Sequence, residues 1–192
     1  MVTKLSSGAR EALHAASAAA EKRTSARIAV VTVPVSDRYD LYPLVFGALA
    51  GFLVFSVLAG FFHAMALREA FLITAAVAAA ATLALESMAL RLMVVPRSAK
   101  NWKCVELAHR AFAARILARN DRKTGICFFV SLGERYVEVV TDRDVDLHIP
   151  QTVWDAIIKE FLAEARQGRV GAALPKAVDA CATVLEQYYP AS

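Results

Sequence analysis

Charged residues are almost absent from two long stretches in the middle of the chain. Residues 41–66 contain no Asp, Glu, Lys or Arg, and residues 70–95 contain only Glu86 and Arg91. A helix of about 26 residues extends about 39 Å, whereas about 20 apolar residues are enough to cross the hydrocarbon core of a bilayer. The sequence therefore predicts a transmembrane helical hairpin over residues 41–95, with one helix in each stretch. Two core helices of a soluble protein fit this uninterrupted apolarity less well.

The basic residues around the hairpin predict its orientation. The turn between the two stretches carries Arg68 as its only Lys or Arg, whereas Arg38, Arg97, Lys100 and Lys103 flank the other end. Basic residues next to membrane spans are retained on the cytoplasmic side. We therefore expect a multi-pass protein of the cytoplasmic (inner) membrane, with the soluble domain and both termini in the cytoplasm.

Three residues of the predicted hairpin are candidates for contacts with a partner. Glu86 is an ionisable group within the second span, where a charge is costly and often functional. Gly47 and Gly51 form a G-x-x-x-G spacing that permits close helix approach, at the level where Glu86 is expected. Two alternatives stay open: Glu86 turns toward Arg91 and the nearby interface, and the glycines pack within the hairpin itself.

The segments on either side of the hairpin read as one discontinuous α/β domain, residues 1–40 and 96–192. Its elements, in order, are a helix to about residue 23, a strand at 27–35, a helix at 100–119, strands at 125–132 and 135–141, a helix from 150, and a helix over 174–188. A strand–helix–strand crossover makes the first two strands parallel, and a tight turn makes the third antiparallel. The sequence thus predicts a small mixed sheet with helices on both faces.

Composition excludes several classes of protein. Hydrophobic residues make up 57% of the 192 residues and charged residues 21%, which is incompatible with a disordered chain. Cys104, Cys127 and Cys181 are widely spaced, and we expect buried, reduced thiols instead of a disulfide scaffold. The net charge is only +4, and basic and acidic residues are interleaved, so nucleic acid is not an expected partner.

The predicted topology gathers acidic residues at one edge of the sheet. The first two strands begin at this edge and the third ends there, which brings Asp121 near Asp142, Asp144 and Asp146, with Arg27 among them. Alternate residues of an extended segment share a face, so the last three aspartates are compatible with one hard cation such as Ca²⁺. The alternative is a solvated acidic loop paired with neighbouring arginines.

Several segments of the soluble part occur in a characteristic order. They are EKRTSARIAVVTV, ELAHRAF, NDRKTGICFFVSLGERYVEVVTDRDV, a helix containing Trp154, and a final helix ending LEQYYP. In this order they resemble the TPM domain family, most closely a bacterial membrane-protein subgroup in which two spans interrupt the domain after its first strand. The resemblance covers roughly residues 5–190 and implies a three-layer α/β/α sandwich interrupted by the hairpin.

The resemblance also implies chemistry. Some TPM relatives are described as acid phosphatases, some as calcium binders, and many have no known activity. The family's acidic site is implied at Asp142 and at Asn120 and Asp121. This chain departs from the family pattern in two places, since Arg27 stands where a glutamate is common and Asp144 stands where a glycine is usual. A guanidinium in place of a carboxylate attracts nearby aspartates, so we expect metal affinity to be weakened.

These observations predict a membrane-anchored TPM-domain protein that acts as a non-catalytic accessory, assembly or interaction subunit of a membrane protein complex. Phosphatase chemistry needs a nucleophile or activated water, and no Cys-x5-Arg loop, DxDGT-like motif or histidine pair is present. The alternative is a calcium-binding, acid-phosphatase-like domain with Asp121 and Asp142 as catalytic candidates and with Asp144 and Asp146 as further metal ligands. The expected partners are the lipid bilayer and another membrane protein, and Ca²⁺ is the only cofactor considered.

Overall fold

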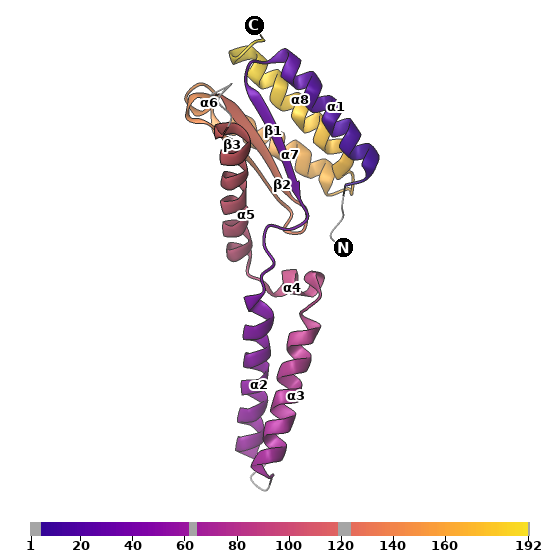
Figure 1. The fold of residues 1–192 in the computed structure, drawn as a ribbon, viewed down its shortest axis with the longest axis vertical. Helices are drawn as coiled ribbons and strands as arrows, with labels where there is room; N and C mark the ends of the chain where they lie inside the picture. The colour runs from indigo at the N-terminus through magenta and orange to yellow at the C-terminus, as the bar shows by residue number, and fades with distance from the viewer. Residues whose placement is uncertain (1–4, 62–64, 119–123, 192) are drawn as a thin grey trace. The chain divides into compact units, whose positions relative to one another are not determined.

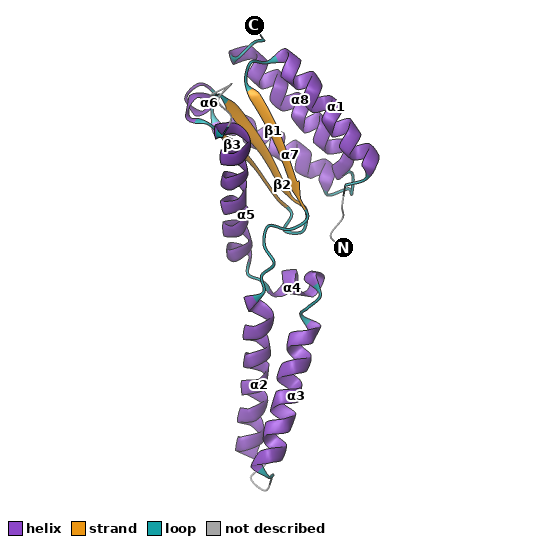
Figure 2. Cartoon of the chain, viewed as in Figure 1, coloured by secondary structure: helices purple, strands orange, loops and turns teal. Residues whose placement is uncertain are grey.

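The computed structural model describes residues 5–61, 65–118 and 124–191. The chain divides into two compact units, of which residues 37–100 form one and the segments on either side form the other. Figure 1 follows the chain from end to end, and Figure 2 distinguishes its helices from its strands.

The second unit is built on a three-stranded mixed sheet, drawn in orange in Figure 2. Its strands are β1 (Arg27–Val33), β2 (Gly125–Ser131) and β3 (Tyr136–Thr141), in the order β1-β2-β3. β1 pairs parallel to β2 with Arg27 opposite Gly125, and β2 pairs antiparallel to β3 with Ile126 opposite Thr141. The predicted mixed sheet is confirmed, including the pairing of strands from either side of the hairpin.

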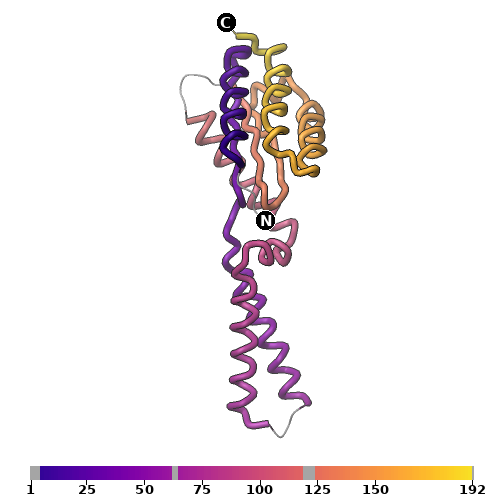
Figure 3. The backbone as a smooth tube through the Cα atoms, turned by 90° about the vertical axis from the view of Figure 1, so that its right-hand side faces the viewer, coloured from indigo at the N-terminus to yellow at the C-terminus, as the bar shows by residue number. Residues whose placement is uncertain are grey.

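Helices cover both faces of this sheet, as predicted. They are α1 (Ser7–Arg23), α5 (Arg97–Phe112) with the π-helical turn η1 (Ala113–Leu117), α7 (Gln151–Ala165) and α8 (Val170–Tyr188). Figures 1 and 3 show α1 and α8 side by side over one face. A further short helix, α6 (Arg143–His148), follows β3. α6 was not predicted from the sequence, where residues 142–146 were expected to be extended.

The central strand explains why the layers hold together. Every residue of β2 is buried. Ile126, Phe128 and Val130 pack into the core shared with α1, α7 and α8, whereas Cys127 and Phe129 pack against α5 and η1. Because successive side chains of a strand point to opposite faces, a strand covered on both sides has an unbroken apolar run. The sequence GICFFVS has this pattern, and the three-layer α/β/α sandwich is therefore the observed architecture.

The first unit contains the two apolar stretches. It comprises α2 (Leu41–Phe61), α3 (Leu67–Ala84) and α4 (Met88–Val94). α2 and α3 are long and apolar enough to cross a membrane, with 21 and 18 residues. Large apolar side chains such as Phe52 (72% exposed) and Phe71 (65% exposed) lie on their outer surface. Such a continuous apolar surface is unusual for a protein in water.

The expected continuous helix over residues 70–95 is wrong. α3 ends at Ala84, a turn occupies residues 85–87, and α4 begins at Met88. The amide of Glu86 donates to the carbonyl of Leu83, and the side chain of Arg91 donates to the carbonyl of Leu85. These bonds give backbone groups at the break the partners that a continuous helix would have supplied. Hydropathy alone does not register such a break, because Leu85 and the residues of α4 are themselves largely apolar.

The two long helices approach each other closely at two glycines. A Cβ atom on Gly47 would lie 2.0 Å from Thr82 Oγ1 and 2.9 Å from the carbonyl oxygen of Ala78. A Cβ atom on Gly51 would lie 3.1 Å from the Cβ of Ala78. Both glycines are buried. The G-x-x-x-G spacing is therefore used between α2 and α3, which is one of the two uses that the sequence left open.

The contact at Gly47 yields a prediction. Gly47→Ala is expected to destabilise the packing of α2 against α3 by about 1–3 kcal/mol, because an added methyl group meets backbone that cannot rotate away. The measurement is the fraction of detergent-solubilised protein that stays monodisperse in size-exclusion chromatography after heating. Gly60→Ala is the matched control, since no atom of the described residues lies within 4 Å of a Cβ at Gly60. Equal stability of the two variants would contradict the observed helix contact.

Candidate functional site

The edge of the sheet where β1 and β2 begin and β3 ends gathers polar side chains from distant parts of the chain. We call this group the rim, and it comprises Thr124, Asp142, Asp144, His148 and Tyr189. The amide of Arg27 bonds the carbonyl of Thr124 at 3.0 Å, and the amide of Asp142 bonds the carbonyl of Gly125 at 3.2 Å. The expected convergence is thus present for these segments. Asn120 and Asp121, which were predicted to join it, lie outside the described residues.

Asp142 joins the start of β2 to the start of α6. Its Oδ1 accepts a hydrogen bond from the amide of Val145 at 2.9 Å, and its Oδ2 accepts one from the amide of Gly125 at 2.7 Å. Aspartate is favoured at the N-cap of a helix because its carboxylate satisfies an amide that has no partner within the helix. Asp142 is buried, and each of its carboxylate oxygens accepts a hydrogen bond from a backbone amide. Asp142 therefore links the start of β2 to the start of α6 through hydrogen bonds to both.

Asp144 and Asp146 do not lie in an extended segment, contrary to expectation. Both belong to α6, where residues two apart project from different sides of the helix. Asp146 accepts a hydrogen bond from the hydroxyl of Thr141, whereas Asp144 accepts from Thr124 at 3.4 Å. The capping bond of Asp142 starts this helix and so removes the shared face that an extended run would offer. Within the described residues, no three His, Cys, Asp or Glu side chains are placed to hold one metal ion.

Tyr189 completes the rim and was not among the residues predicted from the sequence. Its hydroxyl donates to Asp144 Oδ2 at 2.9 Å and lies 3.2 Å from Nδ1 of His148. The same Nδ1 lies 2.8 Å from the carbonyl oxygen of Asp144. Burial, and then the hydrogen bond to Asp144, raise the pKa of Tyr189 to about 12. Tyr189 is therefore a neutral hydrogen-bond donor near pH 7, and the only sequence signal for it was its place in the final LEQYYP segment.

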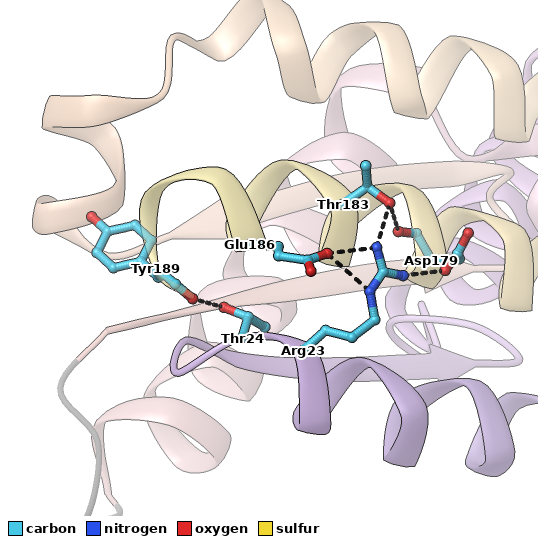
Figure 4. A network of polar contacts seen from close by, with 6 residues as sticks. All are labelled: Arg23, Thr24, Asp179, Thr183, Glu186 and Tyr189. Carbon is cyan, nitrogen blue, oxygen red and sulfur yellow. Dashed lines mark hydrogen bonds and ion pairs between the residues drawn. The ribbon is translucent and has the colours of Figure 1, made fainter. Parts of the chain in front are cut away.

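A network of polar contacts fixes the end of α8 beside the corner between α1 and β1 (Figure 4). The Arg23 guanidinium bonds Asp179 at 2.6 Å, Glu186 at 2.8 Å and Thr183 at 3.0 Å. The buried Thr24 hydroxyl donates to the carbonyl of Tyr189 at 2.6 Å. These contacts hold the backbone at Tyr189, so its side chain is positioned at the rim.

Another polar cluster lies in the unit formed by residues 37–100. It is centred on Arg91, whose side chain is 6% exposed. Its Nη1 donates to Asp40 Oδ1 at 2.7 Å and to the carbonyl of Arg38 at 2.6 Å. Its Nη2 donates to Glu86 Oε2 at 3.2 Å and its Nε to the carbonyl of Leu85 at 3.2 Å. We call this set of bonds the Arg91 latch. It ties the start of α2 to the break after α3.

Glu86 does not lie at the position along the hairpin that the sequence predicted. Because α3 ends at Ala84, Glu86 lies in the turn that follows it, and its side chain is 65% exposed. The expected level beside Gly47 is occupied by Thr82, four residues earlier. The sequence left open whether Glu86 contacts a partner or turns toward Arg91. In the structure its carboxylate turns toward Arg91 and accepts a hydrogen bond from it.

Comparison with known proteins assigns the fold to a family. The family model of the TPM domain matches residues 73–184, which is more than half of the 192 residues. The chain belongs to the TPM domain family. The match includes β2, β3 and the capping Asp142, whereas β1 lies outside the matched residues and pairs with β2 in the same sheet.

A solved structure with the same fold extends this result. The NMR structure of the BA42 protein from the psychrophilic bacterium Bizionia argentinensis is similar to this chain with a TM-score of 0.58 and 14% sequence identity. The similarity covers 99% of this chain and 87% of that chain. At this identity the likeness concerns the TPM fold and carries no activity with it. A comparison with curated proteins gives no match.

The raised pKa of Tyr189 predicts a pH-dependent contribution to the stability of the TPM domain. An unfolded tyrosine has a pKa of about 10, so the folded state favours the neutral phenol. The contribution is complete below about pH 10 and is lost as the pH rises through about 12. In melting temperatures measured between pH 8 and 12, Tyr189→Phe should therefore lose stability less steeply at the alkaline end. Tyr188→Phe serves as the neighbouring control, and identical slopes for all three proteins would refute the assignment.

Proposed function

We propose that this TPM domain protein is held in the cytoplasmic membrane by α2 and α3, with the soluble domain and both termini in the cytoplasm. There it acts as a non-catalytic accessory or interaction subunit of a membrane protein complex. The exposed apolar surface of both helices supports the anchoring part of the proposal, since a bilayer covers such a surface at no cost to the fold. The TPM domain is then the part that meets other proteins.

The observation that carries the non-catalytic role is the bonding of Asp142. Both of its carboxylate oxygens accept hydrogen bonds from backbone amides, so this carboxylate serves the fold first. A metal ligand or a general base needs an oxygen directed at the ion or the substrate. Tyr189, with its pKa near 12, does not supply a base in its place.

The thiols support the same conclusion. Cys104, Cys127 and Cys181 are fully buried. Burial raises the pKa of each, to about 11 for Cys127 and about 12 for Cys181. A nucleophilic cysteine requires a lowered pKa and access to substrate. These three side chains therefore have the properties of packing residues.

The distribution of basic residues supports the proposed orientation. Arg38 precedes α2, and Arg97 and Lys100 follow α4, whereas Arg68 alone lies near the turn between α2 and α3. Lys and Arg within a short distance of the spans determine which side stays in the cytoplasm. Both ends of the hairpin unit are accordingly assigned to the cytoplasmic side.

The accessory role is tested by purification of the full-length protein from its native membranes in a mild detergent. A second membrane protein in fixed stoichiometry is the expected result, and an unrelated two-span membrane protein with the same affinity tag is the control bait. A monodisperse protein without a partner that hydrolyses phosphoesters would overturn the proposal. That result would favour the calcium-binding, acid-phosphatase-like alternative.

A calcium titration separates the two functions at the level of the site. We expect Asp142→Asn to lower the free energy of unfolding by about 1–3 kcal/mol, because one of two buried amides loses its acceptor. Calcium should leave the melting temperature of the wild type, of Asp142→Asn and of the milder variant Asp144→Asn unchanged. A calcium-dependent rise in the wild type that either variant abolishes would speak for a bound cation. Magnesium at the same concentration controls for ionic strength.

The orientation is tested with single introduced cysteines, because the three native thiols are buried. A membrane-impermeant maleimide should label Leu67→Cys, at the start of α3, in intact cells. It should label Ser7→Cys, at the exposed start of α1, only after the membrane is permeabilised. Labelling of Ser7→Cys in intact cells would place the soluble domain outside the cytoplasm. The unmodified protein provides the background signal in both conditions.

A further inference from the structure

α4 has an unusual distribution of side chains for a helix at a protein surface. Leu90 and Met93 are 46% and 80% exposed, and Ala89 beside them is also exposed. The charged residue of the helix, Arg91, is buried with 5% exposure. Successive residues of a helix are about 100° apart, so Arg91 projects from the side opposite Met93 and Ala89. α4 therefore turns its charge inward and its apolar side chains outward.

The Arg91 latch fixes this helix at the end of the hairpin. Arg91 bonds Asp40 and the carbonyl of Arg38, which immediately precede α2, and the carbonyl of Leu85, which immediately follows α3. α4 therefore lies at the level where one long helix begins and the other has just ended. Figures 1 and 3 both show α4 running across the direction of α2 and α3.

The apolar side of α4 continues a surface that is already apolar. Leu83, in the last turn of α3, is 70% exposed, and the turn at residues 85–87 leads directly from it into α4. On the far side of α4, Pro96 is followed by the exposed Arg97, a cation suited to lipid phosphates. An outward apolar face with a neighbouring cation is typical of helices that lie in the interfacial plane of a bilayer.

We propose that α4 is an interfacial helix, which lies along the cytoplasmic surface of the bilayer with Leu90 and Met93 inserted at the boundary between headgroups and acyl chains. The proposal rests on the membrane anchoring by α2 and α3 and adds a third contact with lipid. The Arg91 latch holds α4 across the hairpin and keeps its insertion shallow. The membrane-embedded part of the second stretch then ends at Ala84, so Glu86 and Asp40, the exposed carboxylates that pair with Arg91, lie where charges can reach water.

The test measures the depth of Met93. Met93→Cys is labelled with the environment-sensitive fluorophore NBD in the full-length protein, which is reconstituted at low density in phosphatidylcholine–phosphatidylglycerol vesicles. Phe52→Cys in the middle of α2 is the deep reference, and Ser98→Cys, exposed beyond Pro96, is the aqueous reference. The measurements are quenching by aqueous iodide and quenching by lipids brominated near the headgroup or deep in the acyl chain.

The expected result is that iodide quenches the Met93 label at least about threefold less than the Ser98 label, while shallow bromolipids quench it more than deep ones. Iodide quenching equal to that at Ser98, with Phe52 in lipid, would refute the interfacial helix but leave the hairpin intact. Protection from iodide without bromolipid quenching would show that protein covers α4, which also refutes the proposal. A Phe52 label in water would overturn the membrane anchoring itself.

Discussion

The parallel pairing of β1 with β2 is the constraint on which the rest of the structure depends. These strands lie on opposite sides of the apolar hairpin in the sequence, yet they pair in parallel over their whole length, from Arg27 opposite Gly125 to Val33 opposite Ser131. Any segment inserted between them has to return the chain to the place it left. If that segment crosses a bilayer, the number of crossings must be even. Two long apolar helices satisfy this requirement, whereas a single membrane-spanning helix would place the two parts of the sheet on opposite sides of the bilayer.

The same pairing determines how the rim is built. Because β1 and β2 begin at one edge and β3 ends there, the start of β2, the start of α6 and the end of α8 meet without being neighbours in the sequence. Asp142 and Thr24 satisfy backbone groups at this junction, and Tyr189 donates to Asp144. Carboxylates that cluster at the edge of a sheet can thus serve to stabilise the fold, and their presence is not by itself a sign of catalysis or metal binding.

The layered fold could be predicted from the sequence because its determinants are local or nearly so. The unbroken apolar run of β2 predicts a strand covered on both faces, and the two charge-poor stretches predict long apolar helices. Two of the details that escaped prediction depend on contacts between distant residues, whereas α6 starts at a local N-cap, Asp142, in a segment that was expected to be extended. The break before α4 is held by bonds from Arg91 to Asp40 and Arg38. Tyr189 was missed because its partner Asp144 lies 45 residues earlier.

The order of synthesis gives the β1–β2 pairing a further consequence. α1 and β1 emerge from the ribosome before the apolar helices, but β2 and α8, against which they pack, are made only afterwards. Until β2 is made, the β-branched segment RIAVVTV has no partner strand, and such a segment is prone to associate with other chains. The interval between the synthesis of β1 and that of β2 is therefore a period in which the new chain is open to misassociation.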